Sequence, residues 1–195
     1  MKHFNYFKTG FMALFVLFAL NSCRNPKLDK DGKKQQLDST ETADAGLSDA
    51  QIASIAVTAN KVDISYAEIA EEKAQDEQVK DFAQTMAKDH QTVIDKAMSL
   101  AQKLDVTPED NNITRKLLDM EKDIKEKLNG LSDGEFDKAY INNEVTYHKM
   151  AIDMVENKLI PDCQNKELKD LLESVLPLFK GHLNHAAELK KALEE

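Results

Sequence analysis

Six ionisable side chains occupy helical positions where apolar residues would be expected. They are two carboxylates and four histidines: Asp63, His90, Glu144, His148, His182 and His185. Histidine nitrogens and carboxylate oxygens are the ligands that zinc, iron, copper and manganese take in proteins. If these side chains converge, they form a candidate site for one of those four metals.

Helical projection supports convergence. At 100° per residue, His90 points in the same direction as Met86 and Val79, and His182 lies among leucines and valines such as Val175. Glu144 projects onto the apolar stripe of a third helix. Each of these helices therefore turns an ionisable group towards the core.

The positions of these residues along their helices also predict that they meet. Asp63 lies at the edge of the apolar face of the first helix, and it and His90 are each roughly 20 Å from the turn that joins their helices. Glu144 and His148 form a Glu-x-x-x-His pair, and His182 and His185 form a His-x-x-His pair. Such groups meeting in mid-bundle are typical of metal sites in helical bundles.

Two hypotheses fit this cluster. Buried Glu144–His182 or Asp63–His90 pairs could hold the helix register in a non-enzymatic binding or structural module without binding anything. Alternatively, the cluster is the mid-bundle site of a metal-binding or redox protein. A carboxylate-bridged di-iron centre is disfavoured because it needs Glu-x-x-His on two helices, and Ala and Val stand three residues before His90 and His148.

Apolar residues recur at helical spacing over five segments. The expected helices run from Ser48 to about Gln75, from about Glu77 to Leu104, from Ile113 to Leu128, from Ser132 to about Leu159, and from about Asn165 to the C-terminus through a kink at Pro177. Ser48-Asp49-Ala50-Gln51 and Ser132-Asp133-Gly134-Glu135 both have the form of a capping box. Four long helices with a short one between the second and third predict an all-α, ferritin-like four-helix bundle over residues 48–195, with the short helix in the crossover.

The N-terminus indicates export. Residues 1–22 combine Lys2 and Lys8 with a short apolar run, which is typical of a signal peptide and too short to cross a membrane. Leu20-Asn21-Ser22-Cys23 resembles a lipobox, so we expect Cys23 to carry lipid and anchor the protein in the membrane. Residues 23–47 are nearly devoid of apolar side chains, which predicts a disordered tether.

These features predict a cell-envelope lipoprotein that faces the periplasm. Arg24 after the cysteine favours the outer membrane over the inner one, by resemblance to sorting in well-studied bacteria. The formal net charge of −9 argues against a nucleic-acid partner, because an acidic surface repels a phosphate backbone. With Cys23 lipidated, Cys163 would have no intramolecular disulfide partner.

Three stretches carry a family resemblance: "VKDFAQTMAKDHQ" (79–91), "FDKAYINNEVTYHKMAI" (136–152) and "LPLFKGHL" (176–183). They resemble a bacterial envelope family known as domain of unknown function 4142, whose members look ferritin-like. The resemblance implies that His90, His148 and His182 occupy family-typical positions. Where that family often has Glu on the first helix, this chain has Asp63. The resemblance implies a fold and a compartment but no activity.

Overall fold

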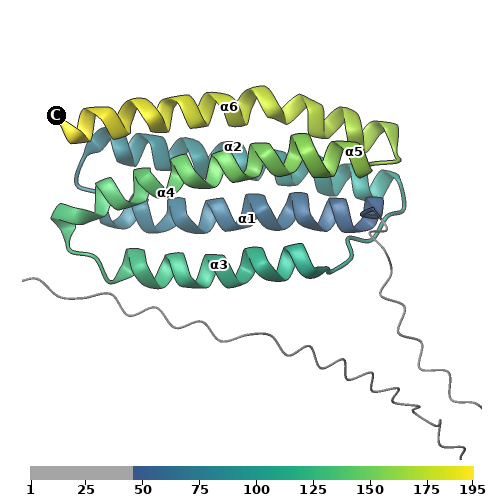
Figure 1. Ribbon diagram of the computed structural model, residues 1–195, viewed down its shortest axis with the longest axis horizontal. Helices are drawn as coiled ribbons and strands as arrows, with labels where there is room; N and C mark the ends of the chain where they lie inside the picture. Colours follow the sequence, from purple (N-terminus) through teal and green to yellow (C-terminus); the bar gives the residue numbers. More distant parts are fainter. Residues whose placement is uncertain (1–45) are drawn as a thin grey trace, which may run out of the picture. The chain divides into compact units, whose positions relative to one another are not determined.

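The computed structural model describes residues 46–195, so the expected signal peptide, Cys23 and nearly all of the tether lie outside the described residues. Over residues 46–195 the chain is all-helical. The elements are α1 (Asp49–Lys73), α2 (Glu77–Lys103), α3 (Asn112–Asn129), α4 (Asp133–Met154), the π-helix η1 (Val155–Leu159), the short α5 (Ile160–Asp162) and α6 (Lys166–Glu194) (Figure 1). None of these described helices is both long and apolar enough to span a membrane.

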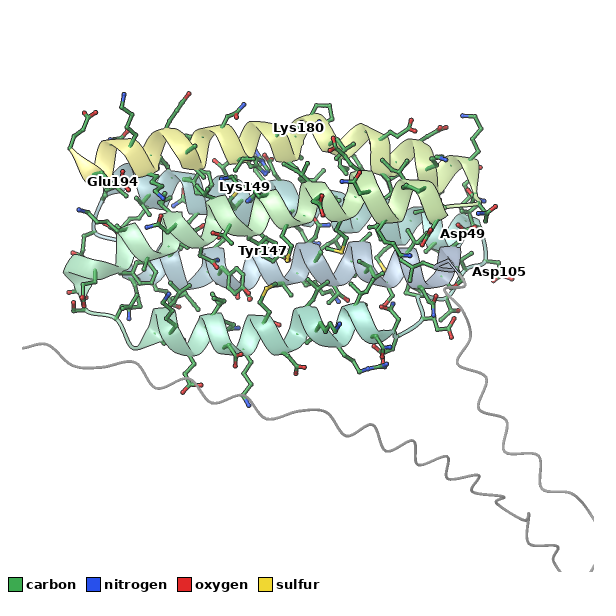
Figure 2. The ribbon with its side chains drawn as sticks, in the orientation of Figure 1. Asp49, Asp105, Tyr147, Lys149, Lys180 and Glu194 are labelled. Carbon is green, nitrogen blue, oxygen red and sulfur yellow. The ribbon has the colours of Figure 1, made fainter. Side chains whose placement is uncertain are left out.

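Four long helices share one core. α1 packs along α2 and α4 along α6, while α2 also contacts α6 and α1 contacts α4. Large side chains from three of these helices, among them Tyr66, Phe82 and Tyr140, are fully buried between them. Burial of each such side chain contributes about 1.5–3 kcal/mol relative to exposure. In Figure 2, Tyr147 lies between α4 and α1, whereas Lys180 and Glu194 lie on the outside.

α3 lies along the outer side of α1 and is tied to it at both ends (Figure 1). Lys73, in the last turn of α1, donates through Nζ to the carbonyls of Leu128 (3.2 Å) and Asn129 (2.8 Å) at the end of α3. At the other end, Asn111 donates through Nδ2 to the carbonyl of Gln51 (3.3 Å). Because a helix leaves its last carbonyls without intrahelical partners, the Lys73 ammonium stabilises the α3 terminus.

One predicted capping box is confirmed and the other is wrong. Ser48 and Gln51 exchange both capping hydrogen bonds at the start of α1, at 3.1 and 3.2 Å. At the start of α4, the Ser132 hydroxyl instead donates to the Glu135 carboxylate (2.8 Å) and makes no capping bond to the backbone. Asp133 and Glu135 still place negative charge in the first turn of α4, where it interacts favourably with the positive end of the helix dipole.

The helix that carries Glu144 continues past the expected stop at Leu159. The η1 turn follows α4 directly, the amide of Ile160 donates to the carbonyl of Val155 five residues earlier, and α5 then continues through Pro161 to Asp162. In a regular α-helix the proline ring would clash with the carbonyl four residues earlier, and the wider π turn offers a way to avoid that clash. α6 runs in one piece through Pro177, as predicted.

Candidate metal centre

Five of the six predicted residues meet in the core. Asp63 comes from α1, His90 from α2, Glu144 and His148 from α4, and His182 from α6, and all five are buried. The three histidine rings have centroids 5.3–5.5 Å apart. The four helices that share the core therefore contribute one compact cluster.

Asn60 orients the His90 ring. The Asn60 amide group donates through Nδ2 to the carbonyl of Ala56 (2.7 Å), which leaves its Oδ1 facing His90 Nδ1 at 2.6 Å. Since that oxygen can only accept, Nδ1 of His90 carries the proton. The other ring nitrogen, Nε2, therefore presents a lone pair.

The other two histidines are oriented in the same way. His148 Nδ1 lies 3.0 Å from the backbone carbonyl of Glu144, and His182 Nε2 lies 3.0 Å from the Asp89 carboxylate. Both partners are acceptors, so these two nitrogens donate. The lone pairs are then on His148 Nε2 and His182 Nδ1.

The three lone-pair nitrogens are available for a ligand. Within residues 46–195, His90 Nε2, His148 Nε2 and His182 Nδ1 are buried and have no hydrogen-bond partner. The three histidines also form a group whose ligand atoms, one from each ring, lie within 4.8 Å of one another. Metal-binding histidines typically donate their second ring nitrogen to a fixed acceptor, as all three do here. The histidines therefore fit a three-nitrogen metal site.

Two carboxyl groups lie beside the histidines. Asp63 Oδ1 is 3.5 Å from His90 Nε2, and Glu144 Oε2 is 3.5 Å from His148 Nδ1. In the described part of the chain, none of the four carboxyl oxygens has a hydrogen-bond partner. Asp63, Glu144 and His148 form a second group that could hold a metal ion. Leaving buried polar groups unpaired costs about 1–3 kcal/mol each, so a ligand shared by these groups would remove part of that cost.

Burial disfavours the charged form of each of the five side chains in this cluster. It raises the pKa of Asp63 to about 8, and burial together with Asp63 raises the pKa of Glu144 well above its ordinary value. Burial and the neighbouring His182 lower the pKa of His148 to about 4, and burial also lowers the pKa of His90 and of His182. A divalent cation that displaced both carboxyl protons would leave a site with no net charge.

His185 does not join the cluster. It lies on the exposed side of α6, with its ring edge-to-face against Phe82 at 5.2 Å between centroids. His185 lies about one turn of helix beyond His182, and its side chain faces the first half of α2 instead of the core. The His-x-x-His spacing of His182 and His185 therefore does not bring both rings into the cluster.

The partners of the histidines also differ from the sequence-based hypotheses. His182 bonds Asp89 rather than Glu144, and His90 bonds Asn60, whereas Asp63 lies 3.5 Å from His90 Nε2 without a hydrogen bond. Sequence reasoning missed both orienting residues. Asn60 lies three residues before Asp63, on the same face of the first helix, and that spacing was the available signal for it. Asp89 directly precedes His90, and because adjacent helical residues face different directions, the spacing gave no signal for Asp89.

Comparison with known proteins agrees with the sequence resemblance. The model of the family described as Domain of unknown function (DUF4142) matches residues 34–189, which include all five residues of the cluster. The chain matches no curated protein and no solved structure.

Proposed function

The chain belongs to the DUF4142 family of domains of unknown function, and we propose that this member binds a divalent transition-metal ion in its core. His90, His148 and His182 would supply nitrogens, and Asp63 and Glu144 would supply oxygens. The observation that carries the proposal is the shared orientation of the histidines: each donates one nitrogen to a fixed acceptor and leaves the other buried and unpaired.

The nitrogen and oxygen ligands of the cluster favour a divalent transition metal over a soft ion such as Cu⁺. Imidazole and carboxylate suit Zn²⁺, Fe²⁺, Mn²⁺ and Cu²⁺, whereas Cu⁺ prefers thiolate and thioether ligands. Cys163, the cysteine among the described residues, lies near the start of α6 and contacts the carbonyl of Asn165 at 3.3 Å. Two carboxyl groups balance the charge of a divalent ion, because ionised Asp63 and Glu144 together carry two negative charges.

We further propose that the four core helices form a ferritin-like bundle. The pairing of α1 with α2 and of α4 with α6 supports this architecture, because α3 then links the two pairs. The bundle would act as a binding module on a cell-envelope lipoprotein, anchored through Cys23 and facing the periplasm at the outer membrane. Residues 1–23 support this location, and intact-mass analysis of membrane-extracted protein tests it: a mature chain that begins with acylated Cys23 is expected, and an unmodified Met1 start would refute it.

Elemental analysis tests metal binding. Protein purified without chelator, and protein loaded separately with Zn, Cu, Fe and Mn, should contain the ion in stoichiometric amount. A His90→Ala/His182→Ala variant should lose the ion, while His185→Ala serves as a matched control that removes an exposed histidine from the same helix as His182. Circular dichroism confirms that each variant is folded. Absence of metal in the loaded wild type, or retention of the ion in the folded double variant, would refute the proposal.

A further inference from the structure

An apolar cavity adjoins the histidine cluster on one side. Asn60, His90 and His148 line it where it meets the cluster, and most of the other lining side chains are aliphatic or aromatic. These come from residues that precede Asp63 on α1, follow His90 on α2, follow His148 on α4 and η1, and precede His182 on α6. The cavity therefore extends from the cluster towards the end of the domain where α1 and α6 begin.

Apart from the unpaired Nε2 atoms of His90 and His148, the polar side chains of the lining already have hydrogen-bond partners. The Asn60 amide bonds both Ala56 and His90, and the Tyr147 hydroxyl donates to the carbonyl of Ala59 at 2.7 Å. A buried water needs two to four polar partners, and beyond these two nitrogens, which the proposed metal would take, the lining side chains offer water none. An apolar occupant loses nothing by the lack of hydrogen bonds.

The size of the cavity limits the occupant. Its volume is about 30 Å³. One water needs about 10–15 Å³ by the same kind of measure, so the space suits an occupant of two or three atoms. A fatty acyl chain or a porphyrin would require far more space.

The η1 turn forms part of the cavity wall. Val155 and Leu159, the first and last residues of the π-helix, both line the cavity. Single π turns occur frequently at functional sites. The departure from regular α-helix that follows α4 thus lies at the cavity, beyond the turn that carries His148.

We infer that this cavity admits a small uncharged diatomic molecule, such as dioxygen or nitric oxide, to the rings that hold the metal. The inference rests on the proposed metal site and deepens it by naming the class of its ligand. Two of the three metal-binding rings, His90 and His148, form the boundary between the cavity and the cluster. The cluster carries its carboxyl groups, Asp63 and Glu144, outside the cavity lining, so the cavity side remains apolar.

Xenon and nitric oxide are the probes that test this inference. Xenon binding is measured by ¹²⁹Xe NMR on metal-free and Zn-loaded protein, and nitric oxide binding by electron paramagnetic resonance on Fe²⁺-loaded protein without oxygen. Ala151→Val adds two methyl groups to the cavity wall. Ala139→Val makes the same change on the same helix, away from the cavity.

The Ala151→Val and Ala139→Val variants are expected to differ in xenon and nitric oxide binding. Wild type and Ala139→Val bind xenon, and their iron forms a nitrosyl adduct; Ala151→Val binds xenon about tenfold more weakly and forms less adduct at equal iron content. Bound metal with no xenon binding, xenon binding with no iron nitrosyl, or no effect of Ala151→Val would refute the inference but not the metal site. Failure to bind any metal would refute the proposed function, and with it the link from cavity to metal, whatever xenon does.

Discussion

Replacing Asp63 with Asn should stabilise the metal-free protein. Burial raises the pKa of Asp63 to about 8 from an ordinary 3.8, so at pH 7 the folded chain holds a proton that the unfolded chain has released. Because the folded pKa is the higher one, the stability present below pH 3.8 is lost as the pH rises towards 8. At about 1.4 kcal/mol per pH unit, the loss reaches about 4 kcal/mol at pH 7. Asn is neutral at every pH and avoids that loss.

Thermal and urea denaturation of chelator-treated protein measure the effect. A gain of about 4 kcal/mol corresponds to a rise in Tm of roughly 8–16 °C for a domain of this size. Glu68→Gln is the matched control, since Glu68 is an exposed carboxylate on the same helix and should change stability by less than about 0.5 kcal/mol. With metal at about 100 times its Kd, wild type should gain about 2.7 kcal/mol, and Asp63→Asn clearly less.

The opposite sign would refute this reasoning. If Asp63 is ionised and paired with a protonated His90 or His148, the Asn variant breaks a buried ion pair and loses about 3–5 kcal/mol. That outcome, together with no stabilisation of wild type by metal, would establish the cluster as a network that holds helix register. The two hypotheses therefore differ in the direction of a single stability change.

Three further predictions follow from the same charges and hydrogen bonds. Metal uptake at pH 7 should release between about one and two protons per ion, because Asp63 and Glu144 both ionise; calorimetry in buffers of different protonation enthalpy measures this, and no release would contradict it. As the pH falls from 6.5 to about 4, the free energy of unfolding of the metal-free wild type should fall by up to about 3 kcal/mol relative to that of His148→Gln, because the pKa of His148 is lower in the folded state. Urea denaturation at each pH measures this, and an equal fall in both proteins would refute it. Asn60→Ala should weaken metal affinity about 10–100-fold in a chelator competition, and unchanged affinity would exclude an orienting role.

The helices were largely predictable because their signals are local. Apolar spacing located the four long helices and the shorter α3 to within a few residues, and Ser48 and Gln51 were enough to predict the capping box at the start of α1. The π turn at Val155–Leu159 was not predictable in this way. A proline ends a helix unless neighbouring packing supports a wider turn, and that packing is a tertiary property.

The candidate site was predictable in its inward-facing residues but not in their partners. A projection gives the direction in which His90 or His182 points, and the cluster confirms those directions. It cannot show that Asn60 from α1 reaches His90 on α2, because the angle and separation of two helices depend on packing across the whole core. His185 was misplaced because a single turn of helix changes the neighbour that a side chain meets.

Anomalous diffraction from metal-loaded crystals tests the central claim most directly. Data collected on both sides of the absorption edge of the bound metal locate the ion and identify its element. We expect a peak about 2.0–2.2 Å from His90 Nε2, His148 Nε2 and His182 Nδ1, with Asn60 and Asp89 still bonded to the opposite ring nitrogens of His90 and His182. A peak only at surface residues such as His185, or no peak in the core of fully loaded protein, would contradict it.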